Sequence, residues 1–299
     1  MSPRPASPAR EPARRVPAPP ALEAGVQTLL ERAARLEKHP LARLITLVEQ
    51  DHDAGRTGRA ALFRYLAGHA DAYPPRARVV GITGTPGSGK STLIGRLALD
   101  LLHAEATARV AVLAIDPSSA ESGGALLGDR VRTHFPVGER RIFFRSQATD
   151  GDLGGVGRRT FAVTRLLRHL FDFVFVETVG IGQSEIEVTA LADLTALVLQ
   201  PLAGDHVQFL KAGVMEVPDL VVINKCDEIA LARRSLHELR AALDTARIGR
   251  AAHPIFRTSA LHGTGITELA DYLRKTARRP DAAALEAIRG RIRPREAGA

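Results

Sequence analysis

Apolar positions follow a helical spacing in the first part of the chain, before about residue 75. Between Ala21 and about Ala70 they recur three and four residues apart. The two stripes consist of Leu22, Val26, Leu29, Leu30 and Ala33, and of Leu41, Leu44, Ile45 and Val48. We therefore expect an N-terminal helical extension over residues 21–75, in which Pro40 separates the helices and Tyr73-Pro74-Pro75 ends the segment.

From Arg78 onward, short apolar runs alternate with helical stretches. The runs expected to form strands are Val79–Thr83, Val110–Ile115, Ile142–Phe144, Phe173–Val176, Leu194–Leu199, Leu220–Ile223 and Pro254–Arg257. Several are apolar throughout, as expected for parallel strands covered on both faces. The expected helices are Gly89–His103, Arg158–Leu170, Asp205–Met215, Ala230–Thr245 and Ile266–Thr276. This alternation predicts an α/β domain over residues 76–279 with a doubly wound, mainly parallel sheet, which binds ligands at the carboxyl ends of its strands.

The two ends of the chain differ from the middle in composition and charge. Residues 1–20 are rich in Pro, Ala and Arg and predict a disordered arm, and residues 280–299 form a short basic tail. The net charge is +8, of which residues 1–20 contribute +3 and residues 271–299 contribute +4. The middle is therefore close to neutral. With 4% aromatic residues the chain also offers no stacking platform for bases, so we expect no nucleic-acid partner.

Cys226 is the one cysteine, which excludes an internal disulfide and fits a reducing compartment. The N-terminus has no apolar stretch typical of a secretory signal. No run approaches the roughly 18 apolar residues of a membrane span. We expect a cytoplasmic protein that does not associate with membranes.

A glycine-rich loop follows the first expected strand. It matches the pattern G-x-x-x-x-G-K-[ST] in full and precedes a helix. Such a loop wraps around a phosphate with its N–H groups pointing inward, and the helix adds its positive N-terminal end. Lys90 is expected to reach the β- and γ-phosphates, and the Ser91 hydroxyl to ligate Mg²⁺. The candidate phosphate-binding residues are Gly84, Thr85, Pro86, Gly87, Ser88, Gly89, Lys90, Ser91 and Thr92.

A candidate base-reading segment, Asn224-Lys225-Cys226-Asp227, follows the apolar strand Leu220–Ile223. The Asp227 carboxylate can accept hydrogen bonds from N1–H and the 2-amino group of guanine, whereas adenine has no donors in that arrangement. Asn224 would support the purine and the loop, and the Lys225 stem would lie along the base. After the last strand, Ser259, Ala260 and Leu261 offer a backbone N–H to guanine O6. The sequence therefore predicts GTP rather than ATP.

Acidic residues at the ends of two strands are candidate magnesium ligands. Glu177 ends one apolar strand and is followed by Gly180, whose N–H can bind the γ-phosphate. Asp116 ends another strand, and Asp129 lies in a glycine-containing segment. Turn capping is the alternative role of either Asp. With Ser91, these acids are the candidate metal ligands, and most small GTPases have Asp where this chain has Glu177.

Polar residues after the strand Leu194–Leu199 are candidate switch residues. Gln208 and Lys211 lie in the segment that begins at Gly204-Asp205, where they can sense the nucleotide or solvate a helix. Cys226, between two base-contacting positions, is expected to serve packing rather than chemistry.

Together these motifs resemble the methylmalonyl-CoA mutase-associated GTPases, the MeaB/ArgK group. The resemblance covers about residues 40–275. It is carried by Asp116-Pro117-Ser118-Ser119, Gly123-Gly124, Leu127-Gly128-Asp129-Arg130, Glu177-Thr178-Val179-Gly180, Gly182-Gln183-Ser184-Glu185, Gly204-Asp205, Gln208, Lys211, Gly213, Met215-Glu216 and Asn224-Lys225.

The resemblance implies a G domain of the all-parallel (SIMIBI) class and a GTP-hydrolysing chaperone. Such proteins couple GTP to loading adenosylcobalamin into a cobalamin-dependent acyl-CoA mutase, and to protecting or repairing that mutase. By position, Asp116, Asp129 and Glu177 resemble the magnesium and switch acids. Lys90 with Glu177 or Asp129 is then the catalytic set. Gln183 and the stretch Gln208–Lys211 resemble the switch segments that contact the partner.

The sequence departs from the family at two places. Family members usually continue past the last helix into an arm used for dimerisation, whereas residues 280–299 form only a short tail. A homodimer therefore stays an alternative, although the short tail disfavours the family's usual one. Asp150 stands where the family tends to have a basic residue, so we expect the partner contacts there to differ.

Three other functions are alternatives. A nickel-insertion GTPase for hydrogenase or urease needs closely spaced Cys and His, but the ten His of this chain form no H-x-H pair. A transport-linked ATPase or kinase is disfavoured by Asp227. A binding module with a degenerate site is disfavoured because the phosphate, metal and base positions are all intact.

Overall fold

The computed structural model describes residues 20–116, 135–136, 138–148, 158–178, 188–201, 218–227, 230, 232–237 and 254–276. The expected arm, the basic tail and the expected helix Asp205–Met215 lie outside the described residues. The expected helix Ala230–Thr245 is helical at 230 and at 232–237, which is the described part of it.

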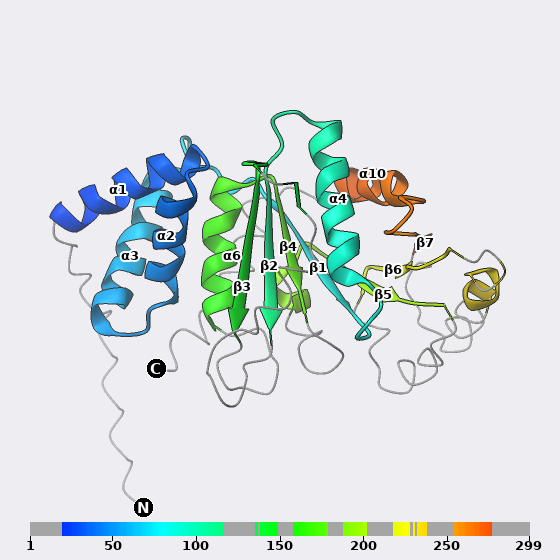
Figure 1. The fold of residues 1–299 in the computed structure, drawn as a ribbon. Helices are drawn as coiled ribbons and strands as arrows, with labels where there is room; N and C mark the ends of the chain where they lie inside the picture. Colours follow the sequence, from blue (N-terminus) through cyan, green and yellow to red (C-terminus); the bar gives the residue numbers. More distant parts are fainter. Residues whose placement is uncertain are drawn as a thin grey trace, which may run out of the picture.

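Seven strands of the described chain form one sheet in the order β3-β2-β4-β1-β5-β6-β7, with every neighbouring pair parallel (Figure 1). The strands are β1 (Arg78–Gly84), β2 (Val110–Asp116), β3 (Ile142–Ala148), β4 (Phe173–Glu177), β5 (Leu194–Leu199), β6 (Leu220–Ile223) and β7 (Ile255–Arg257). Each strand overlaps one of the expected apolar runs, although β3 continues four residues beyond the expected end at Phe144. This confirms the predicted doubly wound parallel sheet.

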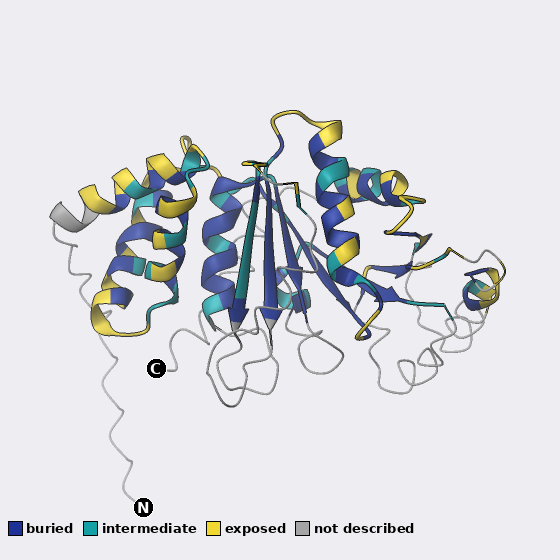
Figure 2. Cartoon of the chain, in the orientation of Figure 1, coloured by how far each residue is buried: buried dark blue, intermediate teal, exposed yellow. Residues whose placement is uncertain are grey.

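Helices cover both faces of the sheet, and consecutive strand residues alternate between the two. α4 (Lys90–Ala104) and α10 (Ile266–Thr276) cover one face, where Val80 and Phe175 are buried. α6 (Arg158–Leu170) covers the other, where Val79 and Val174 are buried. The central strands are consequently buried along their length (Figure 2). Burial on both faces explains why these strands are apolar throughout.

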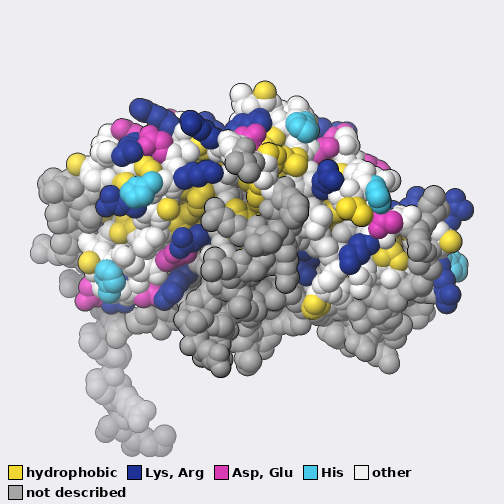
Figure 3. Space-filling model, viewed as in Figure 1, with side chains coloured by type: hydrophobic (Ala, Val, Ile, Leu, Met, Phe, Trp, Pro, Cys, Tyr) yellow, Lys and Arg dark blue, Asp and Glu magenta, His cyan; other side chains and the backbone are white. Residues whose placement is uncertain are grey.

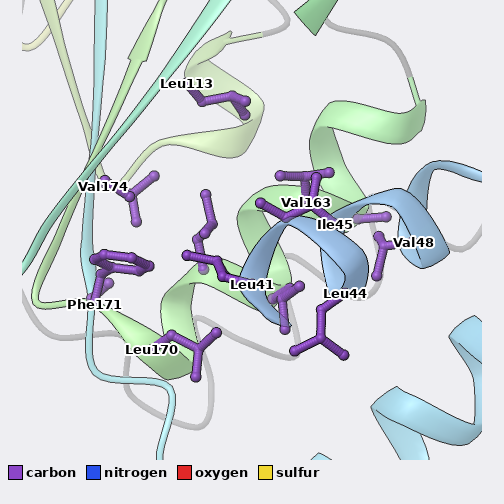
Figure 4. Packing of buried hydrophobic residues seen from close by; sticks show 14 of the residues in the cluster. Leu41, Leu44, Ile45, Val48, Leu113, Val163, Leu170, Phe171 and Val174 are labelled. Atoms are coloured by element: carbon purple, nitrogen blue, oxygen red, sulfur yellow. The ribbon is translucent and has the colours of Figure 1, made fainter. Parts of the chain in front are cut away.

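Three helices precede the first strand and pack beside α6. They are α1 (Pro20–Ala34), α2 (Lys38–Glu49) and α3 (Asp53–Gly68). The apolar stripe of α2 lies against α6, where Ile45 is close to Val163 (Figure 4). Apolar side chains of α1, α2, α3, α6 and the sheet form one continuous buried cluster. The N-terminal helices therefore share a core with the sheet.

The break between α1 and α2 lies earlier than the sequence pattern predicts. Pro40 does not separate the helices but is a buried residue in the first turn of α2. Proline fits there because the first N–H groups of a helix have no partner within the helix. The chain instead turns at Leu36, whose φ is +63° and whose N–H donates to the Ala33 carbonyl at 2.9 Å.

A buried ion pair fixes the amino end of β1. Arg168 of α6 donates to both carboxylate oxygens of Asp193, at 2.9 and 3.0 Å. The two side chains are 3% and 11% exposed. Asp193 also accepts a 2.7 Å bond from the Val79 N–H. A bidentate guanidinium–carboxylate contact has a defined geometry, so this pair fixes the position of α6 relative to the sheet.

A polar link joins α2 to the edge strand β3. Glu49, the last residue of α2, accepts from Arg145 and from Gln147 Nε2, the latter at 3.3 Å. Gln147 in turn accepts a 2.9 Å bond from the Thr160 hydroxyl of α6. Three elements therefore meet at Gln147.

On the face shown in Figure 3, Arg and Lys side chains lie among Asp and Glu side chains across the described surface.

None of the helices in the described part of the chain has the length and apolar character needed to cross a bilayer.

Candidate functional site: a nucleotide-binding edge of the sheet

The carboxyl ends of β1, β4, β6 and β7 bring the candidate site segments to one edge of the sheet. The strand register pairs Ile82 of β1 with Glu177 of β4, and Gly84 with Val198 of β5. Beyond these, β6 ends beside β7, with Ile223 paired to Arg257. Because parallel strands end at the same edge, residues far apart in sequence meet there.

The phosphate loop needs glycine at its two ends. Gly84 has a φ of +141°, and a Cβ there would lie 2.0 Å from the Val198 carbonyl oxygen. Gly89 is the N-cap of α4 with a φ of +85°, and a Cβ there would lie 2.6 Å from Asn224 Nδ2. Neither position admits a side chain without moving a neighbour. The loop therefore packs against β5 and against the segment after β6.

The Lys90 side chain folds back onto the start of this loop. Its Nζ donates to the carbonyl oxygens of Gly84 and Thr85, both at 3.0 Å, and the side chain is buried. The hydroxyls of Thr85 and Ser88 are also buried, and neither has a hydrogen-bond partner within the described residues. Buried polar atoms without partners are costly, so they point to a polar ligand of the loop. An ammonium, two hydroxyls and a helix N-terminus suit a phosphate chain.

Ser91 and Glu177 meet at the start of α4. The Ser91 hydroxyl donates to Glu177 Oε1 at 2.7 Å, and Glu177 is buried at the end of β4. Hydroxyl and carboxylate oxygens are the ligands that Mg²⁺ prefers. Next to them, the Thr178 hydroxyl donates to Thr83 Oγ1 at 3.0 Å, which ties β4 to β1 just before the phosphate loop. These oxygens fit a magnesium site.

Asn224 connects the phosphate loop to the segment after β7. Its Nδ2 donates to the Ser88 carbonyl at 2.9 Å, while its Oδ1 accepts from the Thr258 hydroxyl at 3.0 Å and from the Ala260 N–H at 3.1 Å. The side chain is 1% exposed. Asn224 therefore fixes two loops relative to each other. Of the backbone N–H groups in this segment that were candidates for guanine O6, that of Ala260 is directed at Asn224 in this structure.

Asp227 is the accessible carboxylate of the base segment. Its Oδ1 accepts from the Ser259 hydroxyl, and His262 Nε2 lies 3.6 Å from the same oxygen. The His262 N–H donates to Ser259 Oγ at 3.1 Å. Because Ser259 Oγ accepts from this N–H, its own proton is free to point at Asp227. The carboxylate is thereby oriented at the edge of the site.

The other base-segment residues lie around Asp227. Lys225 has a φ of +59°, and its Nζ donates to Gln200 Oε1 at 3.3 Å. Leu261 is 68% exposed beside the site. Cys226 packs with the apolar residues of β5 and β6, and burial raises the pKa of its thiol. The thiol is therefore a packing group, as expected.

Several expected site residues lie outside what the structure describes. Of Asp116 only the backbone, at the end of β2, is described. The remaining expected residues that fall outside the described ranges are Asp129, Gly180, Gln183, Gln208 and Lys211. The residues that the structure does bring together are those of the phosphate loop, Glu177 and the two base segments.

Arg96 is a site residue that sequence reasoning missed. It lies on α4, and its Nε and Nη2 donate to the carbonyls of Ala260 and Leu261 at 2.9 and 3.0 Å. No motif marks it, because its partners are backbone carbonyls more than 160 positions away. Arg96 follows Lys90 by six residues on α4, and its position beside the base segment is seen only in the folded chain.

A parallel sheet with a phosphate loop, a strand-end acid next to the loop serine and an Asn-Lys-Cys-Asp segment at the same edge defines a P-loop GTPase. More closely, the chain belongs to the family described as the methylmalonyl-CoA mutase-associated GTPase MeaB, whose family model matches residues 41–297. The resemblance that the sequence motifs carry is thus confirmed. Guanine-nucleotide binding and GTP hydrolysis come with this membership.

Relatives from archaea, bacteria and animals align with most of the chain. It is 41% identical over 261 residues to a putative GTPase of Pyrococcus abyssi, with 84% of this chain and 75% of the relative covered. A putative GTPase of Caulobacter vibrioides is 40% identical, with 83% and 73% covered. The mouse protein named methylmalonic aciduria type A homolog, mitochondrial, is 39% identical, with 79% of this chain and 59% of the relative covered.

Solved structures share the fold. The crystal structure of a protein named LAO/AO transport system kinase has a TM-score of 0.66 and 29% identity, and the match covers 92% of this chain and 82% of that one. The HypB protein of Helicobacter pylori, solved in complex with nickel, has a TM-score of 0.51 and 18% identity, with 73% and 93% covered. The second likeness concerns the fold alone.

Proposed function

We propose that this GTPase is a chaperone of a cobalamin-dependent acyl-CoA mutase of the methylmalonyl-CoA mutase type, acting in the cytoplasm. GTP binding and hydrolysis would gate the loading of adenosylcobalamin and protect or reactivate the mutase. The observation that carries this proposal is the family match over residues 41–297. The name of the mouse relative, which refers to methylmalonic aciduria, supports it.

Guanine is held by the segments after β6 and β7. The Asp227 carboxylate accepts from N1–H and the 2-amino group, while Ser259 keeps the carboxylate oriented. Leu261 offers an exposed apolar side chain beside the base, and the Lys225 stem covers the base face. Asn224 holds the segment that carries Ala260 at a fixed distance from the phosphate loop. This arrangement favours GTP over ATP because adenine has no donors for Asp227.

The phosphates are held by residues 84–92. Lys90 supplies a positive charge at the loop mouth, and the Thr85 and Ser88 hydroxyls find in the phosphate oxygens the partners that they otherwise lack among the described residues. The N-terminal end of α4 adds N–H groups and a favourable dipole. These contacts position the γ-phosphate for attack by water. Glu177 or Asp129 then orients that water.

Ser91 and Glu177 are the described residues that would hold Mg²⁺, together with Asp116 and Asp129. The fit rests on the 2.7 Å contact between the two oxygens and on their chemistry as hard ligands. When bound, Mg²⁺ supplies positive charge that stabilises the β- and γ-phosphate oxygens. Gly180, Gln183, Gln208 and Lys211 complete the proposal as the residues that report the nucleotide state to the mutase.

The similar structure named as a transport system kinase raises the alternative of a transport-linked ATPase or kinase. Asp227 separates the two functions. An ATP-dependent enzyme gains nothing from a carboxylate at this position, whereas a guanine reader depends on it. Competition of ATP with GTP for the purified protein is therefore a direct test.

The central experiment mixes the purified protein with a purified cobalamin-dependent acyl-CoA mutase from the same source. Complex formation is followed by size-exclusion chromatography with GDP, GTP or a non-hydrolysable GTP analogue. Adenosylcobalamin transfer is followed by absorbance. We expect a complex that depends on the nucleotide and loading that requires hydrolysis. Lys90→Ala, which removes the loop-mouth charge, should abolish hydrolysis and both dependences.

The possible outcomes separate the parts of the proposal. A protein that hydrolyses GTP but neither binds the mutase nor alters loading would disprove the chaperone role and leave the GTPase intact. Normal hydrolysis by Lys90→Ala would disprove the phosphate-loop assignment. Because no arginine finger is assigned from this chain, we expect slow hydrolysis without a partner.

A further inference from the structure

Arg96 joins the phosphate-loop helix to the base segment through two adjacent peptide groups. Its Nε donates to the Ala260 carbonyl at 2.9 Å and its Nη2 to the Leu261 carbonyl at 3.0 Å. A guanidinium is planar and rigid, so a contact to two consecutive carbonyls fixes the orientation of both. Arg96 lies on α4, which begins at Lys90.

The second carbonyl connects Arg96 to the base-reading carboxylate. The Leu261 C=O and the His262 N–H belong to one planar peptide group, so holding the oxygen also aims the N–H. That N–H donates to Ser259 Oγ at 3.1 Å, and the Ser259 hydroxyl donates to Asp227. A continuous path of hydrogen bonds therefore leads from Arg96 to Asp227.

We infer that Arg96 is a positioning residue for guanine selectivity, which acts on Asp227 through the Leu261–His262 peptide and Ser259. This inference rests on the proposed role of Asp227. It goes beyond that role because Arg96 is placed on the phosphate-loop helix, outside both base segments. The base site is thus oriented from the phosphate side as well as by Asn224.

The test compares the affinities of GDP and inosine diphosphate for the purified full-length protein. Inosine diphosphate differs from GDP by the missing 2-amino group. The affinity for GDP divided by the affinity for inosine diphosphate therefore measures how well Asp227 is oriented toward that group. In Arg96→Gln we expect this ratio to fall by about threefold to tenfold, while the affinity for inosine diphosphate changes less. Arg96→Lys, which can reach one carbonyl, should retain an intermediate ratio.

Thr267→Ala is the matched control. The Thr267 hydroxyl donates to Asp100 Oδ1 at 2.8 Å and so also links α10 to α4, but it does not touch the base segment. We expect this variant to keep the wild-type ratio. A general loosening of the packing between these helices would lower the ratio in both Thr267→Ala and Arg96→Gln, and would overturn the inference.

Two further results are distinguishable. An unchanged ratio in Arg96→Gln and Arg96→Lys, with wild type preferring GDP, would overturn the positioning role alone. A wild-type protein that does not distinguish GDP from inosine diphosphate would instead disprove the proposed role of Asp227. Thermal unfolding of each variant shows whether it is folded. If Arg96→Gln is unfolded, the ratio measured for Arg96→Lys decides the test.

Discussion

The Ser91 hydroxyl donates a 2.7 Å hydrogen bond to Glu177 Oε1, which joins the first turn of α4 to the end of β4. Glu177 is buried, so its charge lies in a medium where electrostatic interactions are strong. The pair places a hydroxyl and a carboxylate oxygen at the phosphate loop. Glu177 is also the last residue of β4.

Replacing Glu177 with Gln should keep the size of the side chain and remove its charge. We expect the rate of GTP hydrolysis to fall by about 10- to 100-fold and the Mg²⁺ concentration needed for half-maximal activity to rise. Hydrolysis measured over a Mg²⁺ titration checks this. GDP affinity without Mg²⁺ is the control and should change little. An unaltered Mg²⁺ dependence would remove Glu177 from the metal site.

Replacing Asp227 with Asn should change the base that the protein accepts. The amide can donate where the carboxylate could not, so xanthosine nucleotides gain a partner and guanine nucleotides lose one. Because hydrogen bonds to charged groups contribute about 1.5–3 kcal/mol, we expect GDP affinity to fall by about 10- to 100-fold. Competition binding with GDP and xanthosine diphosphate measures both changes. Unchanged selectivity would refute the base assignment.

Replacing Asp193 with Ala should leave the buried Arg168 guanidinium without its carboxylate. An uncompensated buried charge costs about 3–5 kcal/mol, and the variant also loses the acceptor of the Val79 N–H. We expect the free energy of unfolding in urea to fall by that amount. Asp53→Asn is the control, because its partner Arg56 is 53% exposed and Asp53 itself is 96% exposed. That change should cost less than about 1 kcal/mol.

The Cys226 thiol should react slowly in the folded protein. Burial raises its pKa, so the reactive thiolate is scarce at neutral pH and becomes more abundant as the pH rises. We expect alkylation by iodoacetamide at pH 7 to be at least about tenfold slower than that of free cysteine. The rate is measured by mass spectrometry, with urea-unfolded protein as the reference. Equal rates in the two states would contradict the packing role.

The sheet was predictable from sequence because its strands are buried on both faces. A largely apolar run of six residues such as Leu194–Leu199 is too short for a typical helix and is typical of a buried strand, and its bounds are those of β5. The edge strand is harder to predict. The apolar pattern places the end of β3 at Phe144, whereas the strand continues to Ala148. Its later residues are polar because Arg145 and Gln147 bind Glu49 of α2, a contact that no local pattern encodes.

The candidate site also has a part that could be predicted from the sequence and a part that could not. The phosphate loop and the base segments could be read from short motifs, since their chemistry depends on neighbouring residues in sequence. The sequence also grouped Ser91 with Glu177 as candidate ligands of one metal, but the role of Arg96 depends on how α4 packs beside the segment after β7. The prediction for Pro40 was wrong for a local reason, because proline both ends helices and fits their first turn. The sequence pattern alone does not distinguish these two positions.

The apolar cluster shared by α1, α2, α3 and α6 has a consequence for shortened forms of the protein. A chain that began at β1 would keep every residue of the phosphate loop and both base segments. It would nevertheless expose to water the side of α6 that Leu44 and Ile45 cover. Aggregation would then mask an intact nucleotide site. Loss of activity on N-terminal truncation would thus report aggregation through the exposed side of α6, not a lost regulatory element.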